Sequence, residues 1–167
     1  MEDMRRISCR PIGVVKVDTS DDEIRERGHE VECESRIMIF PNFKDGLDGL
    51  EGFSHIFVQS YLHKLRPDQT DVLKVRPRRL LKRGFKLDEL PLVGVFAIDS
   101  PTRPNPIGLS LVKLLRIDGL DLFVSGLDLF NGTPILDIKP YRGDYRADNY
   151  ELAQWYRTIR SKAGQDI

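Results

Sequence analysis

Several sequence patterns that reveal common enzyme chemistries are missing from this chain. No Gly-x-Gly-x-x-Gly follows a predicted strand, so the sequence does not support a Rossmann-type cofactor site. P-loop, Gly-x-Ser-x-Gly and His-Glu-x-x-His patterns are missing as well. The only two cysteines, Cys9 and Cys33, belong to no Cys/His cluster. We therefore expect no disulfide framework and no metal site, and a reducing compartment.

Long hydrophobic runs are missing too. No segment approaches the length that spans a membrane, and residues 1–10 lack the apolar core of a signal peptide. We therefore expect a cytoplasmic protein with no membrane partner.

Charge is balanced overall, with 26 basic and 26 acidic residues, but it is unevenly distributed. Residues 18–34 are mostly acidic, whereas residues 74–86 contain seven basic residues and no acid. A basic run can bind a phosphate backbone by releasing condensed counterions. Such runs are, however, about twice as often a solvated surface without a nucleic-acid partner. The candidates for nucleic-acid contacts are Arg76, Arg78, Arg79, Lys82 and Arg83.

Short, partly β-branched apolar runs recur along the chain and predict strands. The expected strands span residues 12–17, 31–40, 54–62, 92–98, 109–117, 122–130 and 134–139. We expect a loop in the acidic stretch, an exposed loop at 63–86, and a helical turn or compact bend at 45–52. Asn131-Gly132 favours a type I′ hairpin turn between the last two strands.

The C-terminal segment changes to a helical period. Asp148 and Glu151 have the spacing of a capping box, and apolar residues recur at helical intervals up to Ile159 before Gly164 ends the helix. The pattern favours a mainly β protein, a single β-barrel domain without a Rossmann fold and with a C-terminal helix. Its expected parts are a tail at 1–10, the barrel at 11–147, and a helix and tail at 148–167 packed on the barrel.

A proline-rich stretch, Asp99 to Gly108, separates two of the predicted strands. Its three prolines fix φ and remove backbone donors, so the segment cannot be a helix or a paired central strand. Such a stiff loop would hold Arg103 and Asn105 in place, so that little conformational freedom is lost when a ligand binds. An equally good explanation is a rigid corner whose polar groups bond only to neighbouring backbone.

Several longer motifs lie in and around this loop, in a fixed order along the chain. They comprise Gly94-Val95-Phe96-Ala97-x-x-Ser100-Pro101-x-Arg103-Pro104-Asn105-Pro106-Ile107-Gly108-Leu109-Ser110, together with residues 11–13, 50–56, 75–77, 127–129 and 132–141. Across residues 11–145 this arrangement resembles the TsaA-like (TrmO, YaeB) tRNA methyltransferase family.

The resemblance implies a homodimeric β-barrel that binds S-adenosylmethionine. The implied reaction is methylation of the exocyclic N6 of threonylcarbamoyladenosine next to the tRNA anticodon. The family's cofactor-binding positions fall on His63, Lys64, Asp99, Leu109, Ser125, Gly126, Leu127 and Asp128. We expect Arg103 and Asn105 to position the reactants, and Asp137 to act as the base or to orient Lys139.

Alternatives remain for these residues. Asp137 and Lys139 could form a solvent-side ion pair, and a histidine such as His63 is more often structural than catalytic. Asp99 stands where the family usually has arginine, and we expect it to pair with Arg103. The alternative function is therefore a catalytically weakened S-adenosylmethionine- or RNA-binding module of the same fold.

Overall fold

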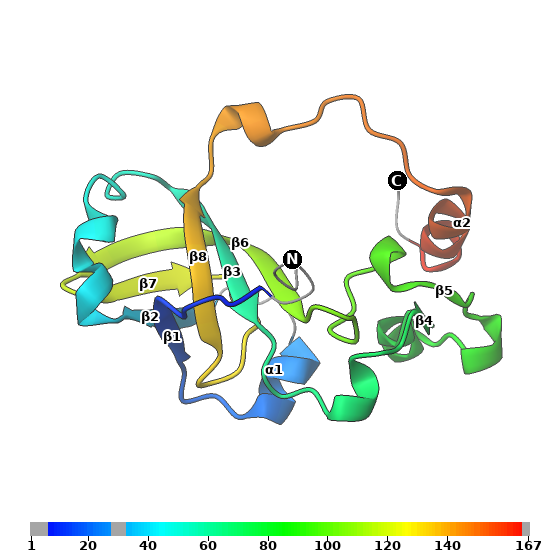
Figure 1. Cartoon of the computed structure of the whole chain (residues 1–167). Coiled ribbons are helices and arrows are strands. Elements are labelled where there is room, and N and C mark those ends of the chain that lie inside the picture. Colours follow the sequence, from blue (N-terminus) through cyan, green and yellow to red (C-terminus); the bar gives the residue numbers. More distant parts are fainter. Residues whose placement is uncertain (1–6, 28–32, 165–167) are drawn as a thin grey trace, which may run out of the picture. The chain divides into compact units, whose positions relative to one another are not determined.

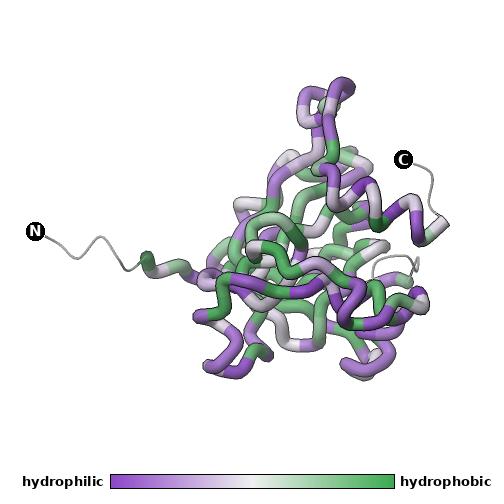
Figure 2. The backbone as a smooth tube through the Cα atoms, turned by 90° about the vertical axis from the view of Figure 1, so that its right-hand side faces the viewer, coloured by the Kyte–Doolittle hydropathy of each residue, from purple (hydrophilic) through white to green (hydrophobic). Residues whose placement is uncertain are grey.

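The computed structural model describes residues 7–27 and 33–164, and the chain divides into two compact units. The first unit comprises residues 1–64 and 106–142, and the second comprises residues 65–105 and 143–167. Hydrophobic and hydrophilic stretches alternate along the backbone (Figure 2). The predicted division into an N-terminal tail, a barrel domain and a C-terminal part packed on the barrel stays a prediction. Residues 1–6, 31–32 and 165–167 of the predicted elements lie outside the described residues.

The first unit is a closed barrel of six antiparallel strands (Figure 1). Its strands follow one another around the barrel in the order β1-β2-β7-β6-β3-β8, and β1 pairs with β8 to close it. Their bounds are β1 Gly13–Lys16, β2 Glu34–Ile39, β3 His55–Tyr61, β6 Ile107–Asp118, β7 Asp121–Ser125 and β8 Pro134–Pro140. The mainly β, barrel-type fold predicted from the strand pattern is confirmed.

Alternating side chains fill the barrel. In β2 and β3 every second residue is buried, among them Ile37, Ile56 and Val58, which are fully inaccessible to solvent. These residues belong to one apolar core cluster with Leu122 and Ile135 from the opposite part of the sequence. Because the side-chain period of a strand is two, the intervening residues form the outer face of the barrel, where chemistry is accessible.

The acidic stretch after β1 forms the helix α1 (Asp21–Arg27), not the predicted loop. A capping box starts it. The Ser20 hydroxyl accepts a hydrogen bond from the Glu23 amide at 3.3 Å, and the Glu23 carboxylate accepts one from the Ser20 amide at 3.0 Å. Ser-x-x-Glu is a sequence signature of a helix N-terminus, so this helix could have been predicted.

The turn before β8 also differs from its prediction. β7 ends at Ser125 rather than at 130, and the Thr133 amide donates to the Phe130 carbonyl at 3.1 Å across Asn131-Gly132. Gly132 has a φ of 80°, whereas no described non-glycine residue has a positive φ. A type I′ turn needs positive φ at both central residues, so the predicted turn type is wrong.

The second unit contains little regular structure. Its strands β4 (Lys74–Val75) and β5 (Val93–Gly94) form a two-stranded sheet, and its helix α2 spans Gln154–Lys162. Short 3₁₀ helices cover Pro67–Gln69, Arg78–Arg83, Leu87–Glu89, Val95–Ala97 and Gly143–Tyr145, and Pro41–Leu47 in the first unit is another. The segment 63–86 is thus partly structured rather than one exposed loop.

The predicted C-terminal helix exists, but its predicted start is wrong. α2 follows Ala153, which makes no side-chain cap, and Asp148 instead pairs with Arg146 at 2.7 Å. Ile159 is buried, as the helical period predicts. Gly164 follows the helix with a φ of 67°, so the predicted glycine terminator is confirmed.

Gly13 gives a stability test of barrel closure, because β1 pairs there with both β2 and β8. A Cβ at this position would lie 2.5 Å from the Met38 carbonyl oxygen. We expect Gly13→Ala to lower the free energy of unfolding by about 1–3 kcal/mol in urea denaturation, the usual cost of overpacking. Gly46→Ala is the control, since nothing lies within 4 Å of its Cβ and its φ is not positive. Equal stability of the two variants would contradict the close approach.

Candidate functional site

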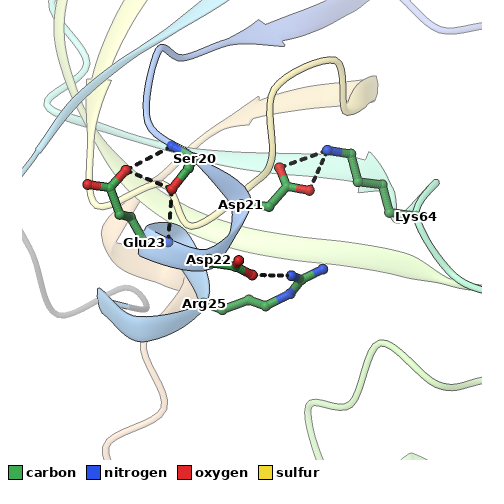
Figure 3. A network of polar contacts seen from close by, with 6 residues as sticks. All are labelled: Ser20, Asp21, Asp22, Glu23, Arg25 and Lys64. Carbon is green, nitrogen blue, oxygen red and sulfur yellow. Dashed lines mark hydrogen bonds and ion pairs between the residues drawn. The ribbon is translucent and has the colours of Figure 1, made fainter.

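Lys64, a predicted cofactor residue, reaches the helix α1 in the first unit (Figure 3). Its ammonium nitrogen donates to both carboxylate oxygens of Asp21 in α1, at 2.7 and 2.6 Å. The same nitrogen lies 5.1 Å from the ring centroid of Phe130, close enough for a cation–π contact. The Arg25 guanidinium of α1 contacts that ring at 4.9 Å. We call Asp21, Arg25, Lys64 and Phe130 the Lys64 cluster.

His63 precedes Lys64 and is half-buried. Burial lowers the pKa of its imidazole below the ordinary value, and the Lys64 ammonium lowers it further, while the Asp21 carboxylate partly offsets both. His63 therefore favours the neutral form, in which one ring nitrogen can accept a hydrogen bond and the other can donate one.

The predicted cofactor residues 125–128 form the start of the loop that carries Phe130. Ser125 is the last residue of β7, and Gly126 follows with a φ of 85°, a conformation that suits glycine. Residues 125–128 are all half-buried, whereas Leu129 is buried in the core. Through Phe130, two residues beyond Asp128, the structure connects this loop to Lys64.

Asp137 and Lys139 lie on β8 and form an ion pair of 2.8 Å. Both side chains are about half exposed, at 43% and 52%. Asp137 also accepts a hydrogen bond from the Ile138 amide at 2.9 Å, which fixes one carboxylate oxygen. The second oxygen faces the ammonium, so the geometry agrees with either predicted role, a base or an orienter of Lys139.

Leu109 shares the outer barrel face with this pair. β3 lies between β8 and β6, and its Gln59 pairs with Asp137 on one side and with Leu109 on the other. Directly opposite residues of an antiparallel pair project from the same face of a sheet. Leu109 is 67% exposed, and its neighbours Ile107 and Leu111 are also exposed, which gives the acidic and basic pair an apolar flank.

The other predicted positioning residues, Arg103 and Asn105, belong to the second unit. Arg103 donates hydrogen bonds to the backbone carbonyls of Ser100, Ile98 and Val95, at 2.7, 2.6 and 3.2 Å. These carbonyls are therefore bound by a side chain instead of a neighbouring strand, which explains why only Val93–Gly94 of the predicted strand 92–98 forms one. Asn105 is exposed.

The expected ion pair of Asp99 with Arg103 is wrong. Among the described residues of the loop, Arg103 bonds to backbone carbonyls, and no ion pair joins it to Asp99. The acidic side chain is exposed instead. Arg103 thus matches the alternative of a rigid corner that satisfies its own backbone, and Asp99 keeps an accessible carboxylate.

The basic candidates divide into two groups within the second unit. The Arg76 side chain donates to the Leu90 carbonyl and is half-buried, so it supports local structure. The remaining candidates are exposed on the 3₁₀ helix Arg78–Arg83; they are Arg78, Arg79, Lys82 and Arg83. Gly84 ends this helix with a φ of 87°.

Over residues 7–27 and 33–164, no group of three or more His, Cys, Asp or Glu side chains is arranged to hold a metal ion. No helix in those ranges is long and apolar enough to cross a membrane.

Sequence reasoning missed Asp21, Arg25 and Phe130. The Ser20–Glu23 capping box could have indicated α1 and so the position of Asp21 in its first turn. Nothing in the sequence indicates that Lys64 reaches α1, since the two are 43 residues apart and meet only through the barrel.

Comparison with known proteins identifies the class to which this barrel belongs. The tRNA-methyltransferase O N-terminal domain family matches residues 19–147, which include every barrel strand except β1 and also the proline-rich loop. The chain belongs to this family, and the relationship predicted from the motifs is confirmed.

Two relatives illustrate the range of the family. A Methanothermobacter thermautotrophicus protein, named a probable S-adenosyl-L-methionine-binding protein, is 43% identical over 145 residues, which are 86% of this chain and 96% of that protein. The rat tRNA (adenine(37)-N6)-methyltransferase is 40% identical over 132 residues, 78% of this chain. The chain spans only 28% of the length of that rat enzyme.

A solved structure supports the fold. The crystal structure of TrmO matches with a TM-score of 0.64 at 32% sequence identity, covering 87% of this chain and 63% of that one. The non-Rossmann barrel is therefore a fold that the family is already known to use.

The His63 environment predicts a pH effect. Because its pKa is lowered in the folded chain, the unfolded chain takes up the proton first as the pH falls. We expect the free energy of unfolding to decrease with falling pH once the pH drops below the ordinary histidine value of about 6.5. His63→Gln should reduce this dependence, measured by urea denaturation at a series of pH values. An identical pH profile in the variant would contradict the depressed pKa.

Proposed function

We propose that this chain is an S-adenosylmethionine-dependent methyltransferase acting on the exocyclic N6 of an adenosine in tRNA. The observation that carries the proposal is the family match over residues 19–147 together with the names of its relatives, an S-adenosyl-L-methionine-binding protein and tRNA (adenine(37)-N6)-methyltransferases. The finer substrate, threonylcarbamoyladenosine next to the anticodon, is part of the proposal.

The side chains near Lys64 fit the chemistry of S-adenosylmethionine. The carboxylate of this cofactor needs a cation, its ribose hydroxyls need hydrogen-bond acceptors, and its adenine favours an aromatic or apolar surface. The first unit supplies the Lys64 ammonium, the half-buried Asp128 carboxylate and the Phe130 ring on converging segments. We assign cofactor binding in the first unit to His63, Lys64, Leu109 and residues 125–128, while a cofactor role of Asp99 rests on the family resemblance alone.

The bound cofactor supplies an electrophilic methyl group on a sulfonium. Methyl transfer would bond that carbon to the adenosine nitrogen, leave the carbon–sulfur electron pair on sulfur, and release a proton from the nitrogen. Asp137 is the proposed acceptor of this proton, because its carboxylate is accessible on the barrel surface and held by the Ile138 amide. Lys139, 2.8 Å away, keeps the carboxylate oriented before the proton arrives.

The proposed partners are tRNA and a second copy of this chain. Exposed basic residues on the 3₁₀ helix Arg78–Arg83 suit tRNA phosphates. Ile107, Leu109 and Leu111 on the outer face of β6 give a homodimer an apolar surface to bury.

The alternative, a binding module without methyl transfer, is favoured by the exposed carboxylate of Asp99. An aspartate only accepts hydrogen bonds when ionised, so it cannot replace the donors of an arginine toward a cofactor carboxylate. Both functions require cofactor or RNA binding, so transfer of the methyl group is what separates them.

A methylation assay with tritiated S-adenosylmethionine tests the proposal. We expect the wild-type chain to label tRNA that carries threonylcarbamoyladenosine, and Asp137→Asn to lower kcat by about 10²- to 10⁴-fold, as loss of a general base does, with unchanged cofactor affinity in calorimetry. Asp118→Asn, an exposed carboxylate at the β6–β7 turn, is the control and should keep full activity. Binding of cofactor or tRNA without labelling would select the binding module, and no binding of either would reject both functions.

Salt dependence tests the proposed tRNA contacts. If Arg78 and Arg79 neutralise phosphates, the slope of log Kobs against log salt should flatten by roughly 0.7–0.9 for each arginine replaced by alanine. Arg66→Ala is the control, because Asp68 already holds that guanidinium at 3.1 Å. An unchanged slope in the double variant would assign these arginines to the solvated surface.

A further inference from the structure

We infer that Asp21 is a positioning residue of the cofactor site, holding the Lys64 ammonium where a bound anionic group would meet it. This inference rests on the proposed function, since it assumes that S-adenosylmethionine is bound at His63 and Lys64. Asp21 is not among the residues that the motifs suggested, and it reaches the site through the helix α1 (Figure 3).

Both carboxylate oxygens of Asp21 contact the Lys64 ammonium. One ammonium nitrogen lies 2.7 Å from Oδ1 and 2.6 Å from Oδ2 of Asp21. An ammonium carries three donors, so a cofactor carboxylate can still receive a hydrogen bond from Lys64 while Asp21 holds it. A lysine on a flexible stem loses rotamer freedom on binding, and here much of that freedom is already lost.

Asp21 is held in place independently of Lys64. It is the first residue of α1, directly after the capping serine, and the Ser20–Glu23 box closes the start of the helix. The Ser20 hydroxyl also donates to the Glu23 carboxylate at 2.8 Å. The carboxylate of Asp21 is therefore presented by a fixed backbone, so the aspartate orients the lysine and not the reverse.

Phe130 completes the arrangement on the other side. Lys64 and Arg25 both lie against its ring, at 5.1 and 4.9 Å from the centroid. Asp22, the neighbour of Asp21, pairs with Arg25 at 2.7 Å. Asp21 and Asp22 thus serve different cations, which gives the chain a matched control for the experiment.

The neighbouring His63 supplies an independent signature of the same contact. The Asp21 carboxylate raises the pKa of His63, against the burial and the Lys64 charge that lower it. Removing the carboxylate must shift this pKa further down. A role of Asp21 limited to tethering α1 through its backbone predicts no such change.

The experiment compares Asp21→Asn, Asp21→Glu and the control Asp22→Asn in the full chain. Because Lys64 and Asp21 are 36% and 31% exposed, solvent screens the pair, and we expect S-adenosylmethionine affinity to fall about three- to fivefold in Asp21→Asn. KM for the cofactor should rise with kcat nearly unchanged, and His63 should titrate at lower pH in NMR. Asp21→Glu should recover part of the affinity, and Asp22→Asn should match the wild type in all three measurements.

A double-variant cycle shows whether Asp21 acts through Lys64. We expect Asp21→Asn to have no further effect on affinity once Lys64→Met is present. Three outcomes would overturn the inference while leaving the proposed function intact. The cofactor affinity of Asp21→Asn could be unchanged or tighter, or the effects in the cycle could be additive. The third outcome is a loss of affinity that is explained by a lower melting temperature of the variant. A wild-type chain that binds no S-adenosylmethionine would overturn the proposed function, and the inference with it.

Discussion

Closure of the barrel is the constraint on which the first unit depends. β1 must pair with β2 on one side and with β8 on the other, and the approach is so close that residue 13 has no room for a Cβ. In the closed order β1-β2-β7-β6-β3-β8, strands from both ends of the unit are neighbours. The Lys64 cluster depends on this arrangement, because it joins α1, the segment after β3 and the loop before β8.

The sequence predicted the barrel well because strand patterns are local. Alternation around Ile37 and the apolar run around Ile56 report burial directly, and those side chains are inside. The type I′ turn and the α2 capping box failed for a different reason. Each depends on a backbone angle or a hydrogen bond that competing contacts decide, as when Asp148 pairs with Arg146 instead of capping the helix.

The site was only partly predictable. The sequence proposed Lys64, Asp128 and Asp137 as site residues, but it could not indicate Asp21 and Phe130, whose relation to Lys64 is set by tertiary structure. Long-range contacts of this kind leave no period in the sequence. The structure also gives Arg103 a local task, since it donates to three carbonyls of its own loop. A side chain within a family motif can therefore serve the structure of its own loop.

The turn at Asn131-Gly132 has a consequence for the whole Lys64 cluster. Gly132 donates to the Val15 carbonyl at 2.9 Å, and the Asn131 side chain accepts from the Val17 amide at 3.3 Å. The loop that carries Phe130 is thereby fastened to the end of β1, and α1 begins four residues beyond Val17. The Phe130 ring and the Asp21 carboxylate, which both contact Lys64, are therefore anchored near the same end of β1. If the end of β1 moved, the Phe130 ring and the Asp21 carboxylate would move with it, and the distance between them would be preserved.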